Sequence, residues 1–260
     1  MCTVSFIPRR NGYAVAMNRD EKLARAAGLP PKVRTLRGRA VLCPSEPGGG
    51  TWIAVNDAGV TLALINWYSV KASVKRDAIS RGEVVKGASA AGGPEDVISA
   101  LSLLPLPAIN PFRLIAVFSA TLEISEWRWD LKRLVHRKHP WAPRQWISSG
   151  YDEPKAQQIR SAAFRFARSQ SPELNLAWLR RLHSSHSPCC GPFSTCMHRA
   201  DAATVSRTEI TLCLRQATMR YQDGAPCQEN PQHVRHLSLN FSHGSGMQAR
   251  PRGRPRPVHR

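Results

Sequence analysis

Residues 1–21 read MCTVSFIPRRNGYAVAMNRDE, and this stretch decides the fold. Its β-prone runs Cys2–Ile7 and Tyr13–Met17 flank the pair Asn11-Gly12. An Asn-Gly pair between two such runs is a strong signal for a β-hairpin. We therefore predict that the first strand begins at the second residue and that the chain then folds back along it.

Cys2 is the most informative residue of this hairpin. We expect Met1 to be removed because the second side chain is small, which leaves a cysteine with a thiol and a free α-amine. The α-amine, with a reference pKa of ~7.7–8.0, can act as general base for its own thiol. The turn brings Arg19 and Asp20 beside Cys2, where an arginine favours the thiolate and an aspartate can orient the amine. The alternative is an ordinary small residue at the start of a strand.

The rest of the chain predicts blocks of strands and helices. Further strands are expected over residues 51–55, 60–66, 112–118, 122–129, 146–149, 193–197, 204–214 and 218–221. Helices are expected over residues 94–104 and 152–168, the second because its apolar residues Ala156, Ile159, Ala163 and Phe166 recur at helical spacing. A further helix is expected after Ser171, which is a suitable N-cap. Residues 22–50 are rich in Pro, Arg and Gly and predict a loop. Strands followed by helices and then strands predict an α+β layered domain with a mostly antiparallel sheet, its later two helices on one face.

Charge is the outstanding feature of the composition. The chain has 37 Lys+Arg and 18 Asp+Glu, a net charge of +19, with an ordinary 42% of hydrophobic residues. Residues 228–260 hold six Arg and one Glu and predict a disordered basic tail, which leaves 31 basic and 17 acidic residues on a domain over residues 1–227. A basic surface can bind nucleic acid, anionic lipid or acidic metabolites, or can simply reflect an arginine-rich proteome. We do not expect nucleic acid as a partner.

Neither a membrane segment nor a secretory signal is predicted. No apolar run approaches the ~18 residues that a membrane helix needs, and the N-terminus lacks a basic segment followed by an apolar one. These features predict a soluble, cytoplasmic protein. The seven cysteines are odd in number and lack CxxC spacing, so we expect mostly free thiols rather than a disulfide framework or a zinc ribbon.

Two further clusters have a structural and a functional interpretation. A metal or haem site is conceivable among His183, His186, Cys189, Cys190, Cys196 and His198, because thiolates and imidazoles are common ligands. Their spacing matches no tetrahedral site, so we expect a polar loop, no metal and no cofactor. Trp127 and Trp129 share one face of a strand, and burial against a helix is favoured over a platform for nucleic-acid bases.

At this point the sequence resembles a known family. Met1-Cys2-Thr3 followed by Asn18-Arg19-Asp20-Glu21 resembles the NRDE family, also called the transport and Golgi organisation protein 2 family. Further matches are Gly49-Gly50-Thr51-Trp52-Ile53-Ala54, Asn56 with Gly59, Ser80-Arg81-Gly82, Ser148-Ser149-Gly150 and residues 196–206. They run in order through residues 1–227, and the tail lies outside the resemblance.

The resemblance implies a four-layer αββα sandwich of the N-terminal-nucleophile hydrolase type. The wider set includes bile-salt hydrolases and penicillin V acylases, which cleave linear amide bonds with an N-terminal cysteine. By this likeness Cys2 corresponds to the nucleophile, Arg19 to the arginine that holds the thiol, and Asp20 or Glu21 to the acid that orients the α-amine. Asn66 corresponds to the residue that stabilises the oxyanion.

The resemblance also leaves some positions open. Acylases have an asparagine where this chain has Ser148-Ser149-Gly150, and Ser149 could donate there instead. The later acylase arginine has two candidates, Arg199 and Arg207.

The candidate binding residues are Asn18, Glu21, Trp67, Tyr68 and Ser149. Of these, Trp67 and Tyr68 could form the wall of an acyl pocket. The predicted function is that of a cysteine amidohydrolase acting on a linear amide or acyl-thioester bond. The alternative is a protein on the same fold that binds or transports haem or an acyl-lipid without turnover, since NRDE proteins are linked to haem trafficking. The expected partner is a small amide, acyl or haem ligand.

Overall fold

The first hairpin forms as predicted in the computed structural model, which describes residues 2–240. β1 (Cys2–Arg9) pairs antiparallel with β2 (Gly12–Lys22). Gly12 has a φ of 145°, and a Cβ atom there would meet the carbonyl oxygen of Leu212 at 2.0 Å. Glycine is therefore required at this turn both for the backbone conformation and for the close approach of the neighbouring strand.

All the strands of the described residues fall into two antiparallel sheets. The first sheet has the order β10 (Arg144–Ser148), β1, β2, β11 (Ala202–Cys213), β12 (Gln216–Asp223) and β13 (Gln232–Ser238). The second follows the chain order β3 (Leu29–Leu36), β4 (Arg39–Ser45), β5 (Ile53–Asn56), β6 (Val60–Asn66), β7 (Phe112–Phe118), β8 (Glu123–Trp129) and β9 (Leu134–His139). The predicted pairing of residues 51–66 and 112–129 into two hairpins is confirmed.

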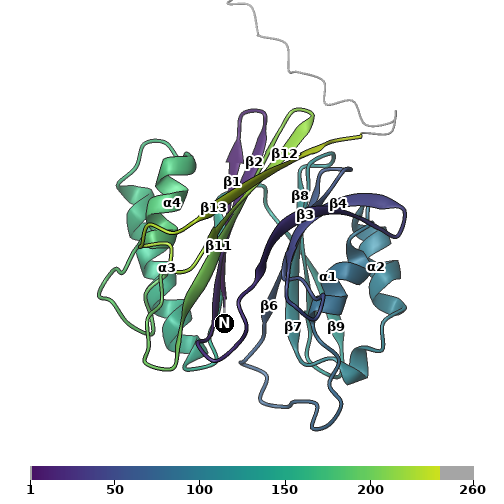
Figure 1. Ribbon diagram of the computed structural model, residues 1–260, viewed down its shortest axis with the longest axis horizontal. Helices are drawn as coiled ribbons and strands as arrows, with labels where there is room; N and C mark the ends of the chain where they lie inside the picture. The colour runs from purple at the N-terminus through teal and green to yellow at the C-terminus, as the bar shows by residue number, and fades with distance from the viewer. Residues whose placement is uncertain (1, 241–260) are drawn as a thin grey trace, which may run out of the picture.

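The two sheets pack face to face and each carries helices on its outer face (Figure 1). Helices α3 (Glu153–Ser169) and α4 (Leu176–Ser184) cover the first sheet, and α1 (Gly82–Ala88) and α2 (Pro94–Ser102) cover the second, with a short 3₁₀ turn at Leu106–Ala108. The expected four-layer αββα sandwich is therefore confirmed. Trp127 and Trp129 lie buried in the core beneath α1 and α2, as predicted.

Alternation along the first hairpin decides which side chains reach the space between the sheets. Val15 and Met17 pack into the core between the two sheets, whereas Ala14 and Ala16 pack against α3 and α4. By the same period of two, Arg19 continues the series that faces the opposite sheet. Cys2 likewise belongs to the core between the sheets.

The prediction of a loop over residues 22–50 is wrong, because the segment contains β3 and β4. Pro30 and Pro31 lie in β3, which is the outermost strand of its sheet and has a register shift between Leu29 and Lys32. An edge strand with an irregular ladder tolerates residues that have no N–H to donate. Proline here therefore marks an edge rather than a loop.

The helical predictions need two corrections. α3 begins after Asp152, whose side chain accepts a hydrogen bond from the Lys155 amide. The buried face of α3 includes Phe164, and the predicted core residue Phe166 is instead 64% exposed. α4 begins after Asn175, not Ser171, since the Asn175 side chain accepts a hydrogen bond from the Trp178 amide. Several amide- or hydroxyl-bearing residues in this stretch are good N-caps, and packing selects among them.

Other differences lie outside the helices. The predicted strand over residues 193–197 is irregular, whereas α1 and β9 were not predicted. The segment 228–260 was expected to be disordered, but Gln232–Ser238 form β13, which pairs with β12 and is the outermost strand of the first sheet. This expectation is wrong for β13, because pairing with β12 supplies hydrogen-bond partners that its composition does not reveal.

Residues 241–260 and the expected removal of Met1 lie outside the described residues. Within residues 2–240, no helix combines the length and apolarity needed to span a membrane.

Candidate active site

Cys2 sits at the start of β1, with neighbouring strands on both sides. Its cross-strand partners are Arg19 of β2 and Ser148 of β10. Its backbone nitrogen donates a hydrogen bond to the Ser148 Oγ at 3.1 Å, and Ser148 is fully buried. The position of the Cys2 backbone is thus fixed by two strands that are far apart in the sequence.

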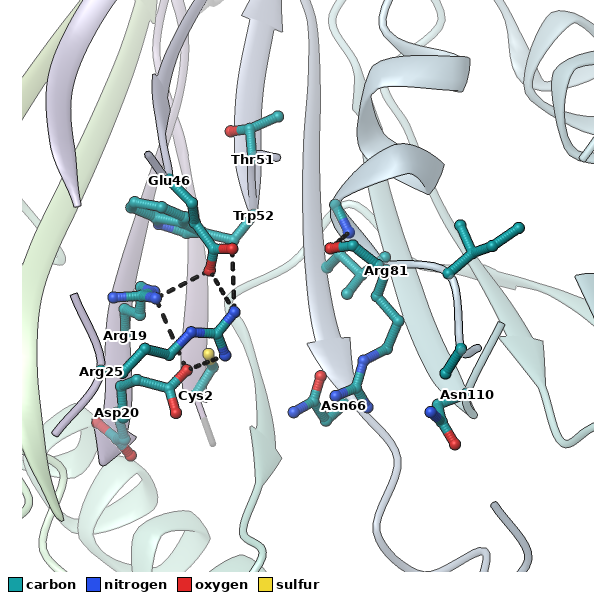
Figure 2. Close-up of a pocket in the computed structure, with 16 residues that line it drawn as sticks. Cys2, Arg19, Asp20, Arg25, Glu46, Thr51, Trp52, Asn66, Arg81 and Asn110 are labelled. Carbon is teal, nitrogen blue, oxygen red and sulfur yellow. Dashed lines mark hydrogen bonds and ion pairs between the residues drawn. The ribbon is translucent and has the colours of Figure 1, made fainter. Parts of the chain in front are cut away.

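A cavity of about 310 Å³ opens beside Cys2 (Figure 2). One wall comes from the first hairpin, and the other from β6 and the segment that leads into α1. The lining residues with polar or aromatic side chains are Cys2, Arg19, Asp20, Glu21, Arg25, Glu46, Thr51, Trp52, Asn66, Ser80, Arg81 and Asn110. Of the predicted catalytic set, Cys2, Arg19 and Asn66 are brought to one cavity, whereas Asp20 borders it but its carboxylate is bonded to Arg160 and Thr204.

Arg19 is held by contacts on two sides. Its Nη2 donates to Glu46 Oε1 at 2.9 Å, and its guanidinium lies 4.6 Å from the ring centroid of Trp52. Arg25 binds the same Glu46 carboxylate and also Glu21, at 2.8 Å. Alternating charges hold the Arg19 guanidinium in one place on the cavity wall, where it is only 4% exposed.

The Asp20 side chain is anchored on the other face of β2. Arg160 of α3 donates to Asp20 Oδ2 at 3.0 Å and to Thr3 Oγ1 at 2.7 Å. Thr204 Oγ1 donates to Asp20 Oδ1 at 2.6 Å. Both members of the Arg160–Asp20 ion pair are fully buried, so this pair connects α3 to the strand that borders the cavity.

The surroundings of the Cys2 thiol act on its pKa in opposite directions. Burial raises the pKa of the Cys2 thiol, and the Asp20 carboxylate raises it further, whereas the positive charge of the N-terminus and, to a smaller extent, the Arg19 guanidinium lower it. The net effect is a raised pKa. A thiol in this environment stays protonated at neutral pH unless a nearby base accepts its proton.

Asn66 and Arg81 belong to the opposite wall. Asn66 ends β6, and its Nδ2 donates to the Tyr68 hydroxyl at 2.7 Å. Arg81 precedes α1 and donates to the carbonyl oxygen of Pro111 at 3.4 Å. Burial lowers the pKa of Arg81. Among the described residues, no carboxylate lies within ion-pair distance of Arg81, in contrast to Arg19 and Arg25.

The remaining predicted binding residues divide between two places. Trp67, Tyr68 and Ser149 line a neighbouring cavity of about 590 Å³, which shares Arg81 and Asn110 with the first. The Tyr68 ring packs against Gly150, and the Ser149 hydroxyl accepts a hydrogen bond from the Tyr151 amide. The predicted wall of an acyl pocket is thus next to the Cys2 cavity rather than part of it.

Asn18 lies away from both cavities. It is fully buried on the helix-facing side of β2, where its Nδ2 donates to the carbonyl oxygens of His183 and Thr195 at 2.8 and 2.9 Å. Its Oδ1 also contacts His183 Nδ1 at 2.9 Å. Asn18 supports the packing of α4 on the sheet instead of lining a ligand site.

Sequence reasoning missed several residues of the site. Glu46 and Arg25 gave no local signal, because packing brings them to the cavity beside Cys2. Ser148, Arg81 and Trp52 each belong to a motif that supported the family resemblance, but the motifs did not show that these residues meet at Cys2. The two candidates for the later arginine do not line the Cys2 cavity: Arg199 pairs with Asp201, and Arg207 donates to Gln222 at 2.7 Å.

Two solved structures share this architecture. Penicillin V acylase from Agrobacterium tumefaciens matches with a TM-score of 0.52 and 10% identity, over 90% of this chain and 85% of the other. A mutant of conjugated bile acid hydrolase from Clostridium perfringens matches with a TM-score of 0.50 and 11% identity, over 95% and 94% of the two chains. The protein thus has an N-terminal-nucleophile hydrolase-like fold.

The family match falls on the first half of the chain. Residues 1–128 match the model of the family described as Transport and Golgi organisation 2, which is the NRDE family that the sequence resembles. This segment contains Cys2, Arg19 and Asn66, together with the whole of β1 to β8 except the last residue of β8. Among curated protein sequences, none matches this chain significantly.

Proposed function

We propose that the protein is an N-terminal-nucleophile cysteine amidohydrolase that cleaves a linear amide or acyl-thioester bond. The observation that carries this proposal is the position of Cys2, whose side chain lines a cavity while its backbone nitrogen bonds to Ser148 and its cross-strand partner is Arg19. A nucleophile and the nitrogen that becomes its base are then held at the same point of the fold.

The first step requires removal of Met1, which turns the Cys2 nitrogen into an α-amine. This amine accepts the thiol proton as the sulfur attacks the substrate carbonyl carbon. The bond from that carbon to the leaving nitrogen or sulfur then breaks, and the ammonium returns the proton to the leaving group. Water attacks the resulting thioester with the amine again as base, which releases the acid and restores the thiol.

The raised pKa of the Cys2 thiol agrees with this use of the amine. A thiol that is not ionised in the resting protein needs a base at the moment of attack. The Ser148 hydroxyl, 3.1 Å from the Cys2 nitrogen, is placed to orient the amine. Arg19 supplies the positive charge that favours the developing thiolate.

In this mechanism, Asn66 stabilises the oxyanion from the opposite wall of the cavity. Its Nδ2 carries two N–H donors, and the Tyr68 hydroxyl uses one of them. The second donor is left to bind the oxygen of the tetrahedral intermediate. One such donor typically contributes about 10²–10³ in rate.

Arg81 supports a preference for acyl substrates that carry an anionic group. It borders both cavities, and no carboxylate of the described residues pairs with it. A substrate carboxylate near Asn66 would complete the charge balance of this wall. The neighbouring cavity, with Trp67 and Tyr68 in its lining, offers space for an apolar acyl chain.

Mass spectrometry of the intact protein tests the proposal. Incubation with an activated acyl probe is expected to add one acyl group to a chain that lacks Met1, and Cys2→Ala is expected to abolish the adduct. Cys43→Ala is the matched control, since Cys43 is a second buried thiol in β4 and does not line the cavity. Retention of Met1, or an adduct that persists in Cys2→Ala, contradicts the mechanism.

A second measurement addresses a carrier on the same fold. Haem is titrated into the wild-type protein and into Cys2→Ser while the Soret absorbance is recorded. If both proteins bind haem equally and saturably, and neither is acylated, the result would contradict a hydrolase and support a haem-binding protein.

A further inference from the structure

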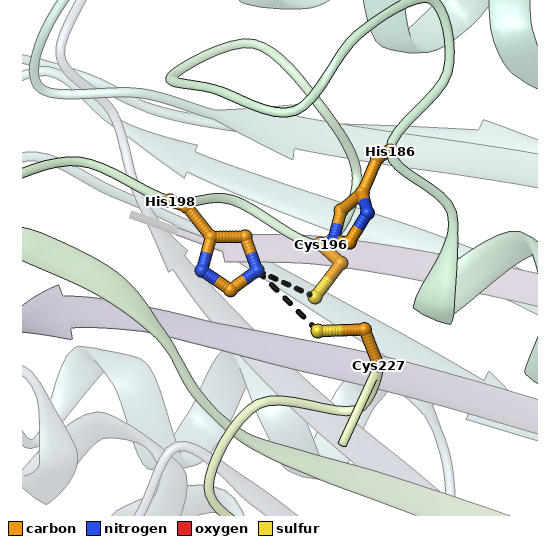
Figure 3. Close-up of side chains that lie close together, drawn as sticks. All are labelled: His186, Cys196, His198 and Cys227. Carbon is orange, nitrogen blue, oxygen red and sulfur yellow. Dashed lines mark hydrogen bonds between the residues drawn. The ribbon is translucent and has the colours of Figure 1, made fainter.

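Four potential metal ligands from three separate segments meet at one end of the first sheet. His186 follows α4, Cys196 and His198 belong to the irregular segment before β11, and Cys227 lies in the loop after β12. One ligand atom from each of the four lies within 4.8 Å of all the others. Figure 3 shows the four side chains pointing toward one another.

Two of the distances between ligand atoms fit the edges of a tetrahedral metal site. His198 Nε2 lies 3.5 Å from Cys196 Sγ and 3.4 Å from Cys227 Sγ. In a tetrahedral zinc site with Zn–N of about 2.0–2.1 Å and Zn–S of about 2.3 Å, neighbouring ligand atoms are about 3.3–3.8 Å apart. The rings of His186 and His198 are 5.0 Å apart and nearly perpendicular, at 72°, so their nitrogens can approach one point from different directions.

Hydrogen bonding within the described residues does not satisfy this cluster. The buried His186 Nε2 has no hydrogen-bond partner, and both thiols contact the same nitrogen of His198. A buried polar atom without a partner destabilises the fold, so a ligand that binds this nitrogen is favoured. Because Cys196 is fully buried and Cys227 is exposed at the rim, the cluster has one side in the protein and one side open to a metal from solution.

We propose that His186, Cys196, His198 and Cys227 bind a zinc ion in a closed N₂S₂ site. Two thiolates and two neutral imidazoles are a typical ligand set for zinc, whereas magnesium and calcium prefer oxygen ligands. The two thiolate charges balance the charge of Zn²⁺. Four protein ligands leave no position for water or substrate, so the zinc has a structural role.

The zinc would join elements that border the proposed active site. Between the ligands Cys196 and His198 lies Met197, whose amide donates to Thr204 Oγ1 at 2.8 Å. Thr204 in turn donates to Asp20 at 2.6 Å. The metal therefore fixes the segment that positions the Asp20 carboxylate, without itself touching the Cys2 cavity.

The sequence alone did not group these four residues. Cys227 lies 29 positions after His198 and joins the others only through the pairing of β11 with β12. The neighbouring candidates have other places: Cys189 and Cys190 are exposed, and His183 bonds to Asn18 and Ser5 beneath α4. Spacing along the chain was thus a poor guide to which thiols and imidazoles meet.

Metal analysis of the untagged, full-length protein tests this proposal. After dialysis, elemental analysis is expected to find one zinc per chain, and X-ray absorption at the zinc edge is expected to show two sulfur and two nitrogen ligands. Replacement of zinc by Co²⁺ is expected to give the visible bands of tetrahedral cobalt and the near-ultraviolet bands of thiolate-to-cobalt charge transfer.

Cysteine variants identify the ligands. Cys227→Ser is expected to weaken zinc binding by more than about 100-fold, beyond the ~10–100-fold typical of changes around the ligands. Cys189→Ser is the matched control, because Cys189 is an exposed thiol of the same region outside the cluster, and it is expected to bind zinc like the wild type.

Three results would overturn the proposal. They are a protein that retains no zinc and gives no cobalt spectrum, a Cys196–Cys227 disulfide in place of the metal, and equal zinc affinity in Cys227→Ser and the wild type. If Cys196→Ser fails to fold, two measurements still test the proposal. They are the zinc affinity of Cys227→Ser, a variant at an exposed position, and the X-ray absorption of the wild-type protein.

Discussion

Cys2 and Arg19 are direct cross-strand partners in the first hairpin, and both belong to the wall of one cavity. Opposite residues of an antiparallel pair have their Cβ atoms about 4.5–5.5 Å apart. The register of a local turn therefore places a guanidinium beside a buried thiol. Since burial raises the pKa of that thiol, the positive charge of Arg19 is expected to favour its ionisation.

Arg19→Gln tests this relationship. The variant loses the charge that favours the thiolate, so alkylation of Cys2 by iodoacetamide is expected to slow by about tenfold or more, the usual effect of one nearby charge on a pKa. Arg19→Lys keeps the charge but not the fork geometry toward Glu46, and its rate is expected to fall between the two. Equal rates in all three proteins would assign Arg19 a purely structural role.

Asn66→Ala is expected to slow acylation of Cys2 by about 10²–10³-fold, because a single oxyanion donor contributes that much. Binding of the acyl probe, measured separately at equilibrium, is expected to change little. Tyr68→Phe is the control, as it removes the hydroxyl that contacts Asn66 and leaves the amide donors in place. A larger loss in Tyr68→Phe than in Asn66→Ala would move the oxyanion site away from Asn66.

Arg81→Gln is expected to remove selectivity rather than reactivity. With two acyl probes that differ only in a carboxylate and its neutral amide, the preference for the carboxylate is expected to fall by about 10–100-fold, since a hydrogen bond to a charged group contributes about 1.5–3 kcal/mol. Arg76→Gln removes the same charge from an exposed position outside both cavities. An equal loss in both variants would point to the overall charge of the surface.

His183 predicts a pH dependence of stability. Burial, together with the charges of Arg207 and Arg160, lowers the pKa of His183 to about 3. In the unfolded chain its pKa returns to about 6.5, so below that pH the unfolded state binds the proton more readily. The neutral ring donates through Nδ1 to Asn18 and accepts at Nε2 from Ser5, a tautomer assigned from this network.

The His183 contribution is therefore complete above about pH 6.5 and is lost as the pH falls toward 3. Urea unfolding at a series of pH values is expected to show this decline in the wild type and a flatter profile in His183→Gln. Removal of the exposed His236 by the same substitution is expected to leave the profile unchanged. A profile that stays steep in His183→Gln would locate the titration elsewhere.

The parts of the fold that could be predicted from the sequence depend on local signals. The pair Asn11-Gly12 indicated the first hairpin and hence the meeting of Cys2 with Arg19. The prolines of β3 concealed an edge strand, because proline is typical of both loops and edges. The strand β13 was missed because its partner β12, not its own composition, stabilises it.

The residues of the candidate site likewise divide into those that local signals predict and those that only packing brings together. Residues contributed by the hairpin could be predicted, whereas Ser148, Glu46 and Arg81 come from other elements and reach Cys2 only through packing. Asn18 was grouped with Arg19 because they are adjacent, yet the alternation of a strand sends them to opposite faces. The alternation of side chains along a strand, applied to this motif, would have assigned Asn18 and Arg19 to different faces of the sheet.

The location of β1 within its sheet has a consequence for the order of events during synthesis. β2 emerges from the ribosome soon after β1, but β10 and β11 follow only after residues 144 and 202. At about 5–20 residues per second, the hairpin waits roughly 6–36 seconds for these two neighbouring strands. Only then does the Ser148 hydroxyl meet the Cys2 nitrogen, and only then does Thr204 bond to Asp20. Chemical competence is therefore expected to arise late, which protects the nascent chain and its surroundings from a prematurely reactive thiol.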